Sequence, residues 1–370
     1  MNAGAFEAAT DRRTEDHDKM NTTVSVSRGI DFHRLQTALF NGRPDGVPLL
    51  ELGIDAGIKA ALLGRPIRTV ADDIEFMRLM GYDFIKIQPR IKFTLNRRSA
   101  SPAAESGAPG YRNAPDRAWA AEHDGVITSW EDFEQYPWPR KQDIDYSAFE
   151  RARAVLPDDM GIIGQYGDIF TTAWEMMGFE NFALAMYEDP ALVEALMGRV
   201  AELVLSMFDS MADMDWVGAL WYSDDIAYTG GLMVSPDFLR ERFFPLLAHI
   251  GALARRRKIP FIYHTDGVLW EVFDDIVAAG VTAIHPIEPK SMNIVEVKDR
   301  YGDRLCVCGN IDVDLLARGT PDDVRALVIE RLETLAPRGG YCLGSSNSVP
   351  DYCRLENYLA MVQAVHDSGL

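Results

Sequence analysis

The sequence contains few cysteines and no long apolar segment. Its four cysteines all lie between Cys306 and Cys353, and their spacing does not match the disulfide framework of a secreted protein. No apolar run approaches the roughly 20 residues that a membrane-spanning helix needs. The first 30 residues contain no apolar core of a secretory signal. These absences predict a cytoplasmic protein with reduced thiols.

Positive charge is also scarce. Lysine and arginine total 37 against 56 aspartates and glutamates, which gives a formal net charge of −19. Such a chain repels phosphate backbones and anionic lipid surfaces, so nucleic acid and membrane are excluded as partners. A highly anionic substrate would be unfavourable as well, unless a local basic cluster received it. A small-molecule substrate is therefore expected.

Phosphate loops, nucleophile elbows and CxxC pairs are absent too, and LGIDAG (52–57) lacks the G-x-G-x-x-G spacing of a dinucleotide fold. What the chain does contain is an alternation of short apolar runs and longer amphipathic stretches. Continuous apolar runs suit parallel strands that are buried on both faces. Eight such runs with intervening helices predict an α/β (β/α)₈ TIM barrel, and a doubly wound open sheet is the alternative. The eight predicted strands are 47–52, 83–88, 161–166, 216–222, 260–264, 282–287, 304–310 and 339–345.

Two segments depart from this alternation. Residues 1–30 are polar and aperiodic, which predicts a disordered lead-in before a single barrel domain at 31–370. Residues 91–145 form a long excursion between the second and third strands. A long connection on a barrel is typical of a lid or rim over the site, although a plain surface insertion is the alternative.

Catalytic groups of a barrel come from the C-terminal ends of its strands. His264 and Asp266 end the fifth predicted strand and Glu288 follows the sixth, so these three are candidate ligands of a divalent metal, with zinc as the first choice. Alternatively, Asp266 only orients a hydrogen-bonded His264 or caps the next helix. All eight predicted strand ends carry polar residues: Glu51 and Asp55; Gln88 and Arg90; Gln165 and Asp168; Tyr222, Asp224 and Asp225; His264 and Asp266; His285 and Glu288; Asn310 and Asp312; Ser345, Ser346 and Asn347.

Asp224 and Asp225 are adjacent, so strand alternation should point one of them into the barrel mouth. That residue is a candidate general acid or base, and we assign the role to Asp224. The cysteines at 306, 308 and 342 lie inside predicted strands and are interpreted as small buried hydrophobes. His285 lies in an apolar strand before a proline, where a hydrogen-bonded core histidine is expected.

Several segments, in this order, make the chain resemble the superfamily of uroporphyrinogen decarboxylases and corrinoid-linked methyltransferases. The resemblance runs from about residue 40 to the end and implies a TIM barrel. It is carried by TSWEDFEQYPWP (128–139), FTTAWEMMGFENFALAMYEDPALVEAL (170–196), SDDIAYTGGLMVSPDFLRERFFP (223–245), YHTDG (263–267), CGNIDVDLLARGTPDDV (308–324) and GGYCLGSSNSVPDYCRLENYLAMVQAV (339–365).

The chain departs from both well-known branches of that superfamily. Where the decarboxylases carry an arginine-rich motif for substrate carboxylates, it reads LLELGIDAGIKAALLGRP (49–66). Their C-terminal histidine is replaced by the stretch from Ser345 to Asn347. Thiol-activating methyltransferases hold zinc through H-x-C and a later cysteine, where this chain has His264-x-Asp266 and SSN. Oxygen ligands make a harder Lewis acid, suited to polarising an ether or alcohol oxygen.

The resemblance therefore implies a metal-assisted methyltransferase that demethylates a small methoxylated or methylated compound onto a corrinoid (cobalamin) carried by a partner protein. Asp224, His264 and Asp266 would be catalytic, with His264, Asp266 and Glu288 on the metal. The alternatives are a decarboxylase of a smaller acid or porphyrinogen-type substrate, and a non-catalytic ligand-binding barrel. Several relatives are dimers, so a homodimer is also considered. The predicted substrate-binding residues are Gln88, Arg90, Gln165, Tyr222 and Asn347.

Overall fold

The structure is a computed structural model, and it describes residues 28–93 and 125–370. The predicted disordered lead-in (1–30) and the long excursion (91–145) therefore fall largely outside the described residues. Within the described part, no helix is long and apolar enough to cross a bilayer.

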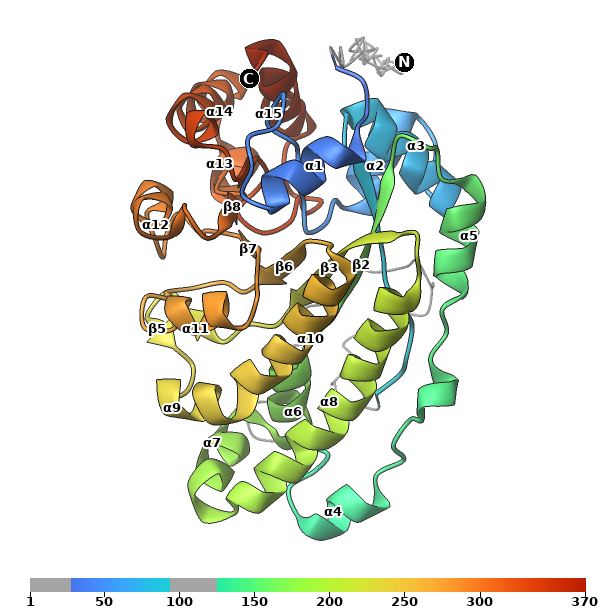
Figure 1. Cartoon of the computed structure of the whole chain (residues 1–370), viewed down its shortest axis with the longest axis vertical. Coiled ribbons are helices and arrows are strands. Elements are labelled where there is room, and N and C mark those ends of the chain that lie inside the picture. Colours follow the sequence, from blue (N-terminus) through green and yellow to red (C-terminus); the bar gives the residue numbers. More distant parts are fainter. Residues whose placement is uncertain (1–27, 94–124) are drawn as a thin grey trace, which may run out of the picture.

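The centre of the fold is a curled, seven-stranded, wholly parallel sheet with the order β1-β2-β3-β6-β7-β8-β9 (Figure 1). Each strand of this sheet coincides with a run that the sequence predicts, with β2 and β3 extending one residue further, so the TIM-type α/β architecture is confirmed. The bounds are β1 (Phe84–Ile87), β2 (Gly161–Gly167), β3 (Val217–Ser223), β6 (Phe261–His264), β7 (Ala283–His285), β8 (Cys306–Cys308) and β9 (Tyr341–Cys342). A small hairpin, β4 (Ala227–Tyr228) and β5 (Gly231–Leu232), follows β3.

The first predicted strand, 47–52, is shorter than expected. It contributes a single parallel bridge, from Leu49 to Leu343 just after β9. Pro48 offers no N–H for a longer ladder, although its carbonyl accepts from the Leu343 amide at 3.0 Å. The segment thus continues the sheet beyond β9 with few hydrogen bonds.

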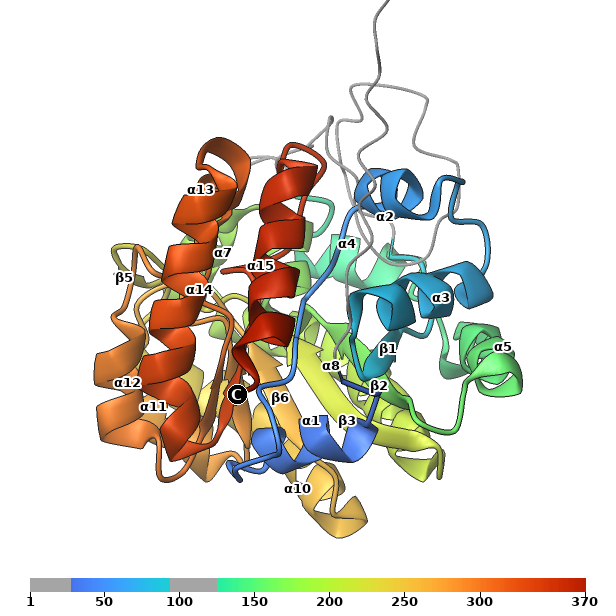
Figure 2. The same ribbon diagram turned by 90° about the horizontal axis from the view of Figure 1, so that it is seen from above.

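Helices cover the sheet, and α8 and α10 lie against each other beside its central strands (Figure 1). Seen from above, α14 and α15 form a neighbouring pair (Figure 2). The remaining bounds are α1 (Phe32–Leu39), α2 (Ala56–Leu63), α3 (Val70–Met80), α4 (Trp130–Gln135), α5 (Ser147–Val155), α6 (Ile169–Met177), α7 (Phe179–Glu188), α8 (Pro190–Asp213), α9 (Pro236–Phe238), α10 (Phe244–Arg257), α11 (Phe273–Ala278), α12 (Ile294–Tyr301), α13 (Val313–Arg318), α14 (Pro321–Leu335) and α15 (Leu355–Ser368).

Strand alternation decides which side chains face the inside of the curled sheet, here called the lumen. A Cβ at Gly164 would contact Met211 of α8, so this position faces the helices and its neighbour Gln165 faces the lumen. Partners in a parallel ladder point to the same side. The register then carries this face through Trp221 and Ser223 to His264 and His285.

Two helical glycines provide a test of close helix packing. A Cβ at Gly251 in α10 would overlap the carbonyl oxygen of Ala279, whereas one at Gly198 in α8 would meet nothing within 4 Å. Gly251→Ala should lower the free energy of unfolding by about 1–3 kcal/mol through overpacking. Gly198→Ala should raise it by roughly 0.5–1 kcal/mol, because alanine is the better helix former. Urea denaturation of both variants checks this, and equal signs would contradict the packing described.

Candidate metal centre

Three potential metal ligands meet at the C-terminal ends of β3 and β6. The ligand atoms of Asp225, His264 and Asp266 all lie within 4.8 Å of one another. His264 is the last residue of β6, and Asp266 follows two residues later. Asp225 lies two residues after Ser223 and therefore shares its lumen side. The sequence singled out His264 and Asp266, and the structure brings them together.

The two carboxylate oxygens of Asp266 differ in their hydrogen bonding. Its Oδ2 accepts a hydrogen bond from Asn347 Nδ2 at 2.8 Å, but its Oδ1 is buried and has no partner among the described residues. Burial, assisted by the charges of Asp225 and Glu288, raises the pKa of Asp266 to about 8. The Asp266 amide donates to Asp225 Oδ1 at 2.9 Å, which fixes the two carboxylates beside each other.

His264 is held by a second histidine. Its Nδ1 lies 2.9 Å from Nδ1 of His285, the partner of His264 in the register of β6 and β7. Burial lowers the pKa of His264 to about 3 and that of His285 well below its usual value, so both rings are neutral. One Nδ1 must then donate and the other accept. If His264 is the donor, its Nε2 keeps a free lone pair, as metal binding requires.

Asp224, the predicted acid or base, has a different position. Its two carboxylate oxygens accept from the amides of Phe170 and Thr171 at 2.6 and 2.9 Å, and from the Tyr222 hydroxyl at 2.6 Å. It thus holds the first turn of α6. Tyr222, predicted to bind substrate, is buried in the same arrangement. The two adjacent aspartates do point to different sides, but it is Asp225 whose carboxylate lies near His264 and Asp266.

Glu288, predicted as the third ligand, does not belong to the group of converging atoms among the described residues. Its Oε2 accepts from the Ser291 hydroxyl at 2.7 Å. Its charge still raises the pKa values of Asp225 and Asp266, although less than burial does. Asp225, rather than Glu288, is therefore the third residue whose ligand atoms converge with those of His264 and Asp266.

The predicted substrate-binding residues fall into two sets. Gln88 Nε2 donates to Gln165 Oε1 at 2.7 Å, and Gln165 Nε2 donates to Ser223 Oγ at 3.0 Å. These two hydrogen bonds connect the residue after β1 with a residue of β2 and with the last residue of β3. Asn347 contacts Asp266, as described above. Arg90 instead is exposed, and its backbone pairs with Asp145.

Sequence analysis listed Glu51 among the polar strand ends but did not single out Lys86, a second buried titratable group. Glu51 accepts from the amide and the hydroxyl of Ser345 at 2.7 and 2.6 Å. Burial raises the pKa of Glu51 to about 8, and the charge of Lys86 opposes that shift. Lys86 Nζ bonds to the carbonyl of Leu52 and lies 4.7 Å from the ring centre of Trp221. A lysine inside the predicted second strand was the available signal.

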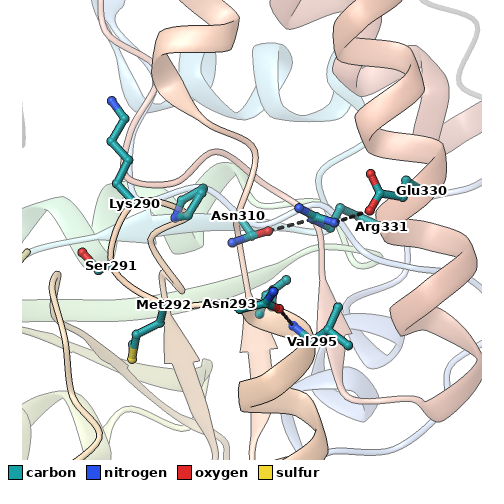
Figure 3. A pocket seen from close by; sticks show the side chains of 10 residues that line it. Lys290, Ser291, Met292, Asn293, Val295, Asn310, Glu330 and Arg331 are labelled. Carbon is teal, nitrogen blue, oxygen red and sulfur yellow. Dashed lines mark hydrogen bonds and ion pairs between the residues drawn. The ribbon is translucent and has the colours of Figure 1, made fainter.

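A cavity of about 340 Å³ lies apart from the three metal ligands, along the start of α12 and beside α14 (Figure 3). Arg331 crosses it and donates to Asn310 Oδ1 at 2.8 Å and to Glu330 at 2.8 Å. Asn310 in turn donates to the carbonyl of Ile287 at 2.7 Å. These polar groups already bond to one another, so the cavity is a weaker candidate for a ligand site than the candidate metal centre.

Comparison with known proteins identifies the family of the chain. The family model described as uroporphyrinogen decarboxylase (URO-D) matches residues 121–368. The uroporphyrinogen decarboxylase of Aliivibrio salmonicida (strain LFI1238) is 24% identical over 232 residues, which is 60% of this chain and 63% of that protein. That of Methylococcus capsulatus (strain ATCC 33009 / NCIMB 11132 / Bath) is 27% identical over 225 residues, 57% of this chain and 61% of the relative. The chain thus matches less than two thirds of the length of these relatives.

Among solved structures, a methyltransferase from Methanosarcina mazei superposes with a TM-score of 0.66 at 17% sequence identity. The superposition covers 92% of this chain and 99% of the methyltransferase. At this identity the likeness establishes the fold alone.

The proton on Glu51 makes a pH-dependent contribution to stability. The folded chain keeps this proton up to about pH 8, whereas an unfolded chain releases it near pH 4.3, so unfolding releases a proton across this window. The free energy of unfolding should therefore fall as pH rises, by at most about 1.4 kcal/mol per pH unit. Glu51→Gln should weaken this dependence in urea denaturation at a series of pH values. Identical slopes for variant and wild type would contradict the assignment.

Proposed function

The chain belongs to the uroporphyrinogen decarboxylase (URO-D) family. From the side chains at the C-terminal ends of its strands, we propose that it is a metal-assisted methyltransferase. It would transfer a methyl group from a small methoxylated or methylated compound to a corrinoid held by a partner protein. The observation that carries the proposal is the buried Oδ1 of Asp266, which has no partner in residues 28–93 and 125–370 and lies beside Asp225 and His264.

These residues fit a divalent cation. The carboxylates of Asp225 and Asp266 are only partly exposed and lie close enough to repel each other, and each has a pKa raised mainly by burial. A cation removes that repulsion and gives Asp266 Oδ1 a partner. One imidazole and two carboxylates suit Zn²⁺, Mn²⁺ or Fe²⁺. Asp225, Asp266 and Nε2 of His264 would hold the ion, which would act as a Lewis acid on a methoxyl oxygen.

The chain's own groups would keep this centre in place. Asn347 fixes one oxygen of Asp266, and the Asp266 amide fixes Asp225. His285 would accept the Nδ1 hydrogen of His264 and thereby select its ligand tautomer. The amides of Gln88 and Gln165 are already ordered by each other, so they would orient a polar substrate with little loss of side-chain entropy.

Decarboxylation of a smaller acid is the second candidate, and two observations favour it. The curated relatives reported above are decarboxylases. Without an ion, Asp266 holds its proton up to about pH 8 and would be an acid able to protonate a carbanion. Arg90, which the sequence suggested for the substrate carboxylate, is exposed. In this reading Lys86, whose charge helps to lower the pKa of His264, would take that role.

Metal content tests the methyltransferase proposal. The content of zinc-class ions in His264→Ala and in Asp225→Asn should be one equivalent lower than in wild type, because each variant removes a ligand. Glu288→Gln is the matched control: it removes a nearby carboxylate charge but no proposed ligand, and it should retain that equivalent. Elemental analysis of the purified proteins measures this.

The same samples separate the two chemistries. Wild type should methylate a free corrinoid in the presence of a methoxylated compound, and His264→Ala should be inactive although folded by circular dichroism. Full metal content in His264→Ala, or in Asp225→Asn, would overturn the proposed centre. A metal-free wild type after supplementation would do the same and would bring decarboxylation forward.

Asn347 provides a graded test. Asn347→Ala removes the hydrogen bond that orients Asp266 but leaves all three ligands. Loss of such an outer contact typically costs about 10–100-fold in metal affinity. Competition with a chromogenic chelator should show a reduction of that size. Unchanged affinity would show that Asn347 has no role in orienting Asp266.

A further inference from the structure

A second cluster of potential ligands lies in the lumen. Cys306 and Cys308 of β8 and Cys342 of β9 are completely buried. The Sγ atom of Cys306 lies 3.8 Å from that of Cys308 and 3.8 Å from that of Cys342. All three sulfur atoms lie within 4.8 Å of one another.

The strand register explains why the thiols meet. Cys306 and Cys308 are two residues apart and so face the same side of β8. Cys308 and Cys342 are direct partners in the ladder between β8 and β9. Cys306 is also the partner of Ala283, which shares the lumen face with His285. The cluster therefore faces the same interior as the metal centre but belongs to different strands.

We propose that Cys306, Cys308 and Cys342 form a second metal site, which binds one soft cation of the Zn²⁺ class through thiolate sulfur. Sulfur atoms held tetrahedrally at about 2.3 Å from zinc lie about 3.8 Å apart. Two of the three separations already have this value, so the backbone needs no rearrangement. On binding, the three thiols release their protons to solvent and each sulfur forms one bond to the ion.

Charge also favours a divalent ion here. Three thiolates with one Zn²⁺ carry a single negative charge. Lys298 of α12 is fully buried nearby, and its Nζ donates to the carbonyl of Gly340, next to β9, at 2.8 Å. Burial lowers the pKa of Lys298, and the charges of the three cysteines oppose that shift. An ammonium at Lys298 would neutralise the loaded site.

The place of the cluster suggests a structural role. β8 and β9 have three and two residues, and the neighbouring segment adds a single bridge at Leu49. This part of the sheet thus has few ladder hydrogen bonds. A shared ion would cross-link both strands from the inside. The site goes beyond the proposed methyl transfer and uses none of its ligands.

Cobalt substitution tests the inference. The full-length chain, produced in cobalt-containing medium, should show the intense sulfur-to-cobalt charge-transfer absorption of thiolate ligation. Cys306→Ser and Cys342→Ser should each lose most of that absorption. Cys353→Ser is the matched control, because Cys353 is also buried but lies outside the cluster; it should keep the full intensity.

His264→Ala separates this inference from the proposed function. It should keep the charge-transfer absorption and lose one metal equivalent, since the oxygen-rich centre contributes no sulfur. Absence of the absorption in wild type, or its survival in both Cys306→Ser and Cys342→Ser, would overturn the thiolate site and leave the cysteines as packing residues. Should the serine variants fail to fold, the wild-type spectrum and the metal released per chain on denaturation decide.

Discussion

The register between parallel strands is the constraint on which the rest of the site depends. Gln165, Ser223, His264 and His285 come from four strands and share the lumen face. Gln165 pairs with Trp221, two residues before Ser223; Ser223 pairs with His264, and His264 pairs with His285. Because side chains alternate with a period of two, a single slip would turn this whole row towards the helices. His264 therefore owes its position to the register of the sheet, whereas Asp225 and Asp266 lie just after the ends of β3 and β6.

Desolvation then determines the chemistry of the row. Asp225, Asp266 and Glu51 have pKa values raised mainly by burial, while burial lowers those of His264, His285 and Lys86. Burial thus favours the neutral form of both the acidic and the basic side chains in the interior. Such an interior holds carboxyl protons that a cation can displace, and pKa values perturbed in this way are typical of functional sites.

The sequence predicts the architecture well because the strands are continuous apolar runs, a strong local signal. It also identifies His264, Asp266 and Asn347, since polar residues at strand ends are conspicuous. It fails where the outcome depends on contacts distant in the chain. The sequence favoured Asp224 over Asp225 because it does not show that the first amides of α6 donate to the Asp224 carboxylate. The cysteines looked like isolated hydrophobes because their meeting depends on the pairing of β8 with β9.

The two adjacent aspartates after β3 have different roles. Asp224 secures the start of α6, and Asp225 faces the proposed ligands. A substitution at Asp225 changes the chemistry of the mouth and leaves the helix anchored. Deletion of one residue in β3 would move both side chains to the opposite side and damage both at once. The length of β3 therefore constrains the helix anchor and the proposed metal ligand together.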